Sequence, residues 1–280
     1  MEAALAGVIR NTRTVLALLA ALMMTMLFGC TAAPAFNGPA GERFDGTRFV
    51  NREPMDKSLG DFVKLAWGAV TEASDWPGWV ETSQGEIPAE RVYQGVSVTF
   101  INHATFLIQV DGINILTDPI YSERASPFQW AGPRRVHAPG IAMEELPPID
   151  LVLISHNHYD HLDEATLAGL SEQQEKPPLI VAGLGNGLLF DQLGLPNHRD
   201  LDWDESTQLG DVEIVFTECR HRSGRGVGDQ MTTLWGSFVL KTTAGNLYFA
   251  GDTGYGPHLK EAGEDHGPFR LALLPIGAYE

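Results

Sequence analysis

Four residues able to bind metal ions lie within six positions of this chain. They are His156, His158, Asp160 and His161. Imidazole nitrogen suits borderline ions such as zinc, and a carboxylate oxygen can hold a second ion beside it. Two ions about 3.5 to 4 Å apart can share and activate an attacking water. A histidine-rich surface loop without ligands is the alternative, but a metal site accounts better for this spacing.

The residues before this cluster indicate how it is positioned. Leu151 to Ile154 form a short apolar run, the pattern of a strand buried on both faces. The cluster then lies on the loop at the end of that strand, where several side chains can turn toward one point. The other predicted elements are strands at 96–101, 105–110, 113–117, 179–182, 212–217, 232–240 and 246–250, a turn at Asp111 and Gly112, and helices capped by Asp163, at 187–193 and at 256–267.

The segment HNHYDH at 156–161 matches the HxHxDH signature of the metallo-β-lactamase superfamily. Further segments resemble its N-acylphosphatidylethanolamine-hydrolysing phospholipase D branch: VTFINHAT at 98–105, LTDPIYSERASPFQWAGPRR at 116–135, TLWGSF, FAGDTGY and LPIGAYE. The similarity covers residues 94–280. It implies an α/β (α+β) fold, the αββα sandwich, with a site for two Zn²⁺ ions that hydrolyses a phosphodiester of a phospholipid.

The resemblance also implies a role for each candidate ligand. His156, His158 and His221 correspond to a three-histidine site, while Asp160 and His161 begin a second site. Asp252 would bridge both ions, and Asp160 is the best candidate to orient the attacking water or receive its proton. Without the histidine motif, Gly251 and Asp252 would be interpreted as an ordinary turn.

The resemblance predicts one ligand that the sequence does not supply. The family has a further histidine downstream, and here only His258 and His266 follow His221. Both lie in a polar stretch and are expected to be solvated. The resemblance therefore predicts a truncated chain in which the second half of the sandwich is incomplete, the second ion is held weakly, and a sheet edge is exposed to aggregation.

Other polar residues near the motifs could support the site. Asp118 follows a predicted strand and is expected to fix the tautomer of a metal-bound histidine, although it could simply form a turn with Pro119. His103 could lie near the substrate or be a core histidine. Three arginines flanking His221 could hold an anionic head group or form a solvated basic loop; they are Arg220, Arg222 and Arg225.

Composition limits the alternatives. The chain has 280 residues, 44% of them hydrophobic, which is enough for one large domain over 94–280. Its formal charge of -17 disfavours sequence-independent binding to nucleic acid phosphates, and therefore a nuclease. Remaining alternatives are a lactonase or another phosphoesterase of the same fold, or a catalytically impaired lipoprotein. The family resemblance also suggests a homodimer.

The amino terminus predicts export. Arg10 and Arg13 precede an apolar run from Val15 to Phe28, which has the length of a signal-peptide core. The residues up to Cys30 resemble a bacterial lipobox, so residues 1–29 are expected to be a lipoprotein signal peptide. A lipidated Cys30 would then hold the protein in the cell envelope, at the outer membrane facing the periplasm. An uncleaved membrane anchor is the alternative.

Two segments separate this leader from the hydrolase domain. Residues 30–53 are rich in Ala, Gly and Pro and are predicted to be a flexible tether. Residues 54–93 are predicted to be a helical extension, because apolar residues from Leu59 to Val70 recur at helical spacing. Trp76 and Trp79 follow and are expected to fill a core seam rather than enter a membrane interface.

Overall fold

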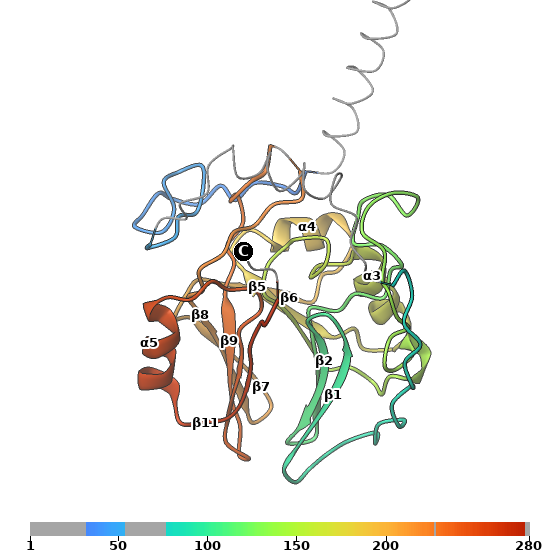
Figure 1. Ribbon diagram of the computed structural model, residues 1–280. Helices are drawn as coiled ribbons and strands as arrows, with labels where there is room; N and C mark the ends of the chain where they lie inside the picture. The colour runs from blue at the N-terminus through green and yellow to red at the C-terminus, as the bar shows by residue number, and fades with distance from the viewer. Residues whose placement is uncertain (1–31, 54–76, 227, 278–280) are drawn as a thin grey trace, which may run out of the picture.

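The computed structural model describes residues 32–53, 77–226 and 228–277. These residues form two sheets packed face to face, with helices on the outer faces (Figure 1). The predicted leader at 1–29 and the predicted helix from Leu59 lie outside the described residues. In the part of the chain that the structure describes, no helix is long and apolar enough to cross a membrane.

The first sheet has six strands in the order of the sequence. They are β1 (Val96–Asn102), β2 (Thr105–Val110), β3 (Ile113–Thr117), β4 (Leu151–Ile154), β5 (Leu179–Gly183) and β6 (His198–Leu201). β1 to β3 are antiparallel, whereas β3 to β6 are parallel. Asp111 and Gly112 form the predicted turn, with φ values of 52° and 74°. Every residue of β4 is buried, as its apolar run predicted.

The second sheet has five strands in the order β11-β10-β9-β8-β7. They are β7 (Ser206–Leu209), β8 (Val212–Thr217), β9 (Ser237–Lys241), β10 (Asn246–Phe249) and β11 (Phe269–Leu273). The prediction of a strand over 232–240 was wrong in its first half. Leu234 N–H donates to Leu184 O and Gly236 N–H to Ser155 O. The backbone before Ser237 therefore bonds to loops of the first sheet instead of to a strand.

The helices complete four layers. They are the short 3₁₀ helix η1 (Met143–Glu145), α3 (Glu164–Glu172), α4 (Gly187–Gln192) and α5 (Pro257–His266). α3 and α4 pack on the outer face of the first sheet through Leu167, Leu170 and Phe190. α5 packs on the outer face of the second through Ala262. The predicted αββα layering is confirmed, and Figure 1 shows α3 and α5 on opposite sides of the molecule.

Asp163 occupies the predicted N-cap position of α3, but its side chain makes no capping hydrogen bond to the helix backbone. Its carboxylate instead accepts hydrogen bonds from the backbone N–H and the hydroxyl of Ser122. The side chain thus ties the loop after β3 to the start of α3, next to the loop that carries the histidine motif.

The main hydrophobic core lies between the two sheets. Inward-facing side chains of both sheets meet there, among them Ile115, Leu153, Val181, Phe216, Phe238 and Leu247. Trp235 is fully buried, and its indole N–H donates to Cys219 O at 3.1 Å. This core fixes both sheets relative to each other, so the loops at their common end are held in fixed positions.

The amino-terminal segment differs from the flexible tether predicted for it. In its described part, Phe44 is 4% exposed and Phe49 is 1% exposed, and both belong to the core between the sheets. Phe49 N–H donates to Met231 O and Phe36 N–H to Thr232 O. Aromatic burial and these bonds hold the segment on the domain. Trp79, expected in a core seam, is 43% exposed, and Trp76 lies outside the described residues.

Candidate metal centre

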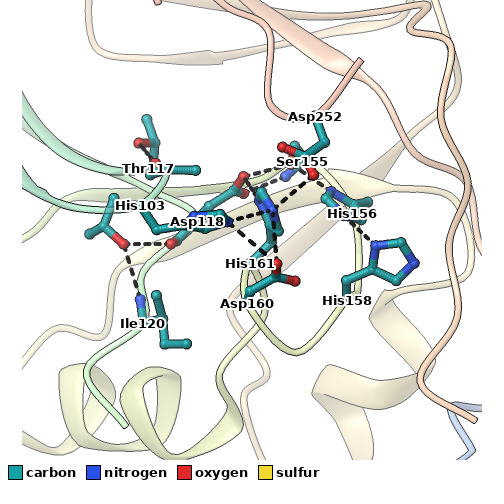
Figure 2. Close-up of polar contacts among 12 residues, drawn as sticks. His103, Thr117, Asp118, Ile120, Ser155, His156, His158, Asp160, His161 and Asp252 are labelled. Atoms are coloured by element: carbon teal, nitrogen blue, oxygen red, sulfur yellow. Dashed lines mark hydrogen bonds and ion pairs between the residues drawn. The ribbon is translucent and has the colours of Figure 1, made fainter. Parts of the chain in front are cut away.

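The histidine motif lies on the loop that follows β4, as its sequence predicted. His156 is 1% exposed and His161 is fully buried. Backbone N–H groups of His161 and Leu162 both donate to His158 O, which makes the loop turn tightly. The turn brings side chains two to five positions apart to one point, and Figure 2 shows them gathered beside Asp118 and Asp252.

The first group consists of three imidazoles. His156 Nε2 lies 2.8 Å from His158 Nδ1, and His221 Nε2 lies 3.3 Å from the same atom. Zinc–nitrogen bonds of about 2.0–2.1 Å in a tetrahedral arrangement separate ligand atoms by roughly 3.3 Å. His221 follows β8 in the other sheet, so the two sheets together assemble this group. The donor types and spacing fit a zinc-type ion.

The second group contains Asp160 and His161, with His103 and Asp252 beside them. Asp252 follows β10, and its Oδ2 lies 3.4 Å from His161 Nε2 and 3.9 Å from His221 Nε2. One carboxylate oxygen therefore faces both groups, as expected for a bridging ligand. The turn alternative for Asp252 does not account for this placement. His103 lies on the turn between β1 and β2 and reaches the same point.

Asp118 supports the second group from behind. Its Oδ2 accepts a hydrogen bond from His161 Nδ1 at 2.7 Å, and both side chains are fully buried. Ser155 donates its N–H to Oδ1 at 2.7 Å and its hydroxyl to Oδ2 at 2.6 Å. This is the geometry that fixes the orientation of a ligating histidine and leaves its Nε2 facing the site. Ser155 was not predicted, although it directly precedes the motif.

Comparison with known families agrees with this geometry. Residues 113–280 match the family model described as a β-lactamase superfamily domain. The chain belongs to the β-lactamase superfamily. The metallo hydrolase Igni18 from Ignicoccus hospitalis has the same fold, with a TM-score of 0.50 and 22% identity over 66% of this chain and 72% of that one.

Several curated proteins are similar to this superfamily member. An uncharacterized protein of Mycobacterium tuberculosis is 41% identical over 242 residues, which cover 82% of this chain and 63% of that protein. N-acyl-phosphatidylethanolamine-hydrolyzing phospholipase D 1 of Caenorhabditis elegans is 33% identical, over 66% of this chain and 55% of that protein. A UPF0173 metal-dependent hydrolase of Methanopyrus kandleri is 30% identical, over 65% and 72% respectively. The chain thus spans less than two thirds of the length of the first two.

The three histidines of the first group are held in the uncharged state that binds a cation. Burial lowers the pKa of His158 to about 4 and that of His221 to about 3. Burial likewise lowers the pKa of His156 well below its ordinary value. At neutral pH these imidazoles are uncharged, and their lone pairs can bind a metal ion without first losing a proton.

His161 behaves in the opposite way. Burial lowers its pKa, but the carboxylates of Asp118, Asp252 and Asp160 together outweigh burial and raise the pKa to about 10. In the metal-free protein His161 is therefore a cation between Asp118 and the carboxylates of Asp160 and Asp252. A metal ion binding at Nε2 must displace that proton, so loading of the second group is expected to release a proton.

The metal-free protein is expected to lose stability in mild acid. The pKa of His158 is about 4 in the folded protein against an ordinary 6.5. Between these values the unfolded chain binds more protons, so stability rises with pH there and is lost as pH falls. At about pH 5 the protonation of this one histidine in the unfolded chain should lower the free energy of unfolding by about 2 kcal/mol. Urea unfolding at several pH values measures the effect, and the metal-free His158→Ala variant should show a shallower dependence; an equally steep one would contradict the assignment.

Arg225 does not have the head-group role suggested for it. It is 9% exposed, and its Nη1 donates to Asn157 O at 3.0 Å and Leu162 O at 2.9 Å. Its Nη2 donates to Glu164 at 2.8 Å, and the guanidinium lies 3.9 Å from the centre of the Tyr159 ring. Because its donors are directed at the histidine loop, Arg225 braces that loop from the side.

His258 is buried, contrary to the expectation that it is solvated. It is 4% exposed, and its Nε2 lies 2.8 Å from Thr253 Oγ1. The same hydroxyl accepts a hydrogen bond from Arg220 N–H at 3.0 Å. Thr253 is next to Asp252 and Arg220 is next to His221, so this bridge ties together two loops that carry ligands. The prediction of a helix around His258 was nevertheless confirmed, and His266 at its end is partly exposed.

Proposed function

We propose that this protein is a metal-dependent hydrolase that uses two zinc ions to cleave a phosphodiester bond of a phospholipid. The observation that carries the proposal is the Asp252 oxygen placed between the three-histidine group and the group of Asp160 and His161. Two such groups sharing one carboxylate can hold two ions close enough to act on one substrate.

The chemistry follows from the residues around the two groups. Bound zinc would lower the pKa of a water toward neutrality and offset charge that develops on phosphoryl oxygens. Burial opposes ionisation of Asp160, but a hydrogen bond from His103 and the charge of His161 lower its pKa. Asp160 is therefore ionised at neutral pH. Its side chain is 44% exposed, so it can orient the attacking water and accept its proton.

The substrate class rests on similarity. The worm phospholipase D is 33% identical over 195 residues, and two of the segments that resemble this branch, VTFINHAT and FAGDTGY, contain His103 and Asp252. A phospholipid substrate would also suit a protein anchored to the cell envelope through a lipid on Cys30, a residue outside the described part of the chain. We include this anchoring at the outer membrane in the proposal.

Product analysis tests the proposal. The purified chain, loaded with zinc, is incubated with vesicles that contain N-acylphosphatidylethanolamine, and release of phosphatidate is measured. Asp160→Asn is expected to lower the rate by roughly 10²–10⁴-fold, the usual effect of losing a general base. Asp211→Asn, at an exposed position, is the matched control. Opening of lactone rings without phosphatidate release would refute the proposed substrate and favour a lactonase.

A further inference from the structure

The turn between β1 and β2 holds a histidine in an unusual backbone conformation. His103 has φ of 43°, in the left-handed region that residues other than glycine rarely adopt. The turn is anchored on both sides: Asn102 Nδ2 donates to Ile120 O at 2.9 Å, and Thr105 Oγ1 donates to Asp118 O at 2.7 Å. The loop that anchors the turn is therefore the loop that orients His161.

The anchored turn directs the His103 ring at the second group. His103 Nε2 lies 3.2 Å from His161 Nε2 and 3.4 Å from Asp160 Oδ2 (Figure 2). The side chain is 49% exposed, so it approaches from the solvent side while His161 approaches from the interior. Carboxylates and imidazoles from three separate loops thus meet at one point.

One ligand atom from each of His103, Asp160 and His161 lies within 4.8 Å of the other two, so these three residues could hold a metal ion, and Asp252 lies beside them. His161 Nε2 lies 3.4 Å from Asp252 Oδ2 and 3.9 Å from Asp160 Oδ2. Bonds of about 2.0–2.2 Å to zinc in a tetrahedral arrangement place ligand atoms roughly 3.3–3.6 Å apart. The two distances from His103 Nε2 and the contact between His161 and Asp252 agree with such an arrangement within a few tenths of an ångström.

We propose that His103 is a ligand of the second metal ion, together with Asp160, His161 and Asp252. The proposal rests on the function proposed above, because it assumes that the second group holds an ion. It accounts for the strained turn: the left-handed conformation places Nε2 where the site needs a donor. A hydrogen bond from His103 to Asp160, without a metal ion, is the competing explanation of the same contacts.

Binding of zinc alone distinguishes the two explanations. The full chain is stripped with a chelator and titrated with Zn²⁺ in a calorimeter. The wild-type chain is expected to bind two ions, as the two-metal arrangement requires. In His103→Asn the affinity for one ion should fall by at least about tenfold, the smallest effect usual for residues supporting a metal site, while the other affinity is unchanged. Asparagine tolerates the left-handed conformation, so the turn is retained.

A second variant guards against a purely structural effect. His103→Gly relieves the backbone strain and leaves a space open to solvent. Added imidazole should restore the affinity of this variant for its second ion, because a free ring can replace the missing ligand. His266→Asn, at the end of α5, is the matched control and should bind both ions like the wild type.

The outcomes are separable from the proposed function. Two ions bound with wild-type affinity by both His103 variants, or a wild-type chain that binds only one ion, would overturn the ligand proposal. Selective loss of one ion with rescue by imidazole would support it. This support would stand even if the chain released no phosphatidate, since the measurement depends on binding and not on turnover.

Discussion

Replacing Asp252 with alanine is expected to cause a large loss of both activity and bound metal. Its Oδ2 faces His161 Nε2 at 3.4 Å and His221 Nε2 at 3.9 Å, so the change removes a donor from both groups at once. The two ions would lose their link and their spacing. Hydrolysis should fall by roughly 10³-fold or more, and tightly bound zinc from about two ions per chain to one or fewer.

The fold should survive this substitution. Asp252 contributes its backbone oxygen to a contact with the Cys219 thiol, at 3.5 Å, and alanine keeps that oxygen. Far-ultraviolet circular dichroism and the melting temperature of the metal-free variant check this point. Asp265→Ala, at an exposed position of α5, is the matched control for loss of a carboxylate. An Asp252→Ala chain with two bound ions and a near-normal rate would show that the two groups are independent.

The sequence predicted most of the residues that gather in the candidate metal centre, because these residues follow strands. Asp118, His156 and Asp252 each lie within three residues of the end of a strand, and loops at one end of packed sheets lie close together. The local cluster also needs little help from the rest of the chain, since one tight turn brings His158 and His161 together. Residue type, short spacing and position after a strand were therefore sufficient to predict that these side chains lie together.

The residues that the sequence did not predict depend on contacts between distant segments. His258 is buried and lies within hydrogen-bond distance of Thr253, whose hydroxyl also accepts from the backbone N–H of Arg220, and a polar helix gives no sign of this. Phe44 and Phe49 lie in a stretch whose composition resembles a linker, yet both side chains are buried because they pack in the core between the sheets. The backbone before Ser237 reads as a strand, but its hydrogen bonds go to the loops of the other sheet.

Asp118→Asn is expected to weaken the site without removing any ligand. The Asp118 carboxylate accepts three hydrogen bonds, one from His161 Nδ1 and two from Ser155, and it is fully buried. An amide has one oxygen, so its NH₂ group must face a donor, and the negative charge that raises the His161 pKa is lost. The affinity for the second metal ion, or the rate of hydrolysis, should fall by about 10–100-fold.

The pKa of His161 distinguishes this mechanism from simple loss of stability. In the metal-free protein that pKa is about 10, because Asp118, with Asp252 and Asp160, opposes the effect of burial. In Asp118→Asn it should fall, because burial then acts unopposed by that charge, and zinc binding near neutral pH should release fewer protons. Proton release is measured by calorimetry in buffers of different ionisation enthalpy. Ser155→Ala keeps the Asp118 charge, so it should preserve proton release while lowering the stability of the fold. If proton release were lost in Ser155→Ala as well, the hydrogen-bonded network, and not the Asp118 charge, would set the protonation of His161.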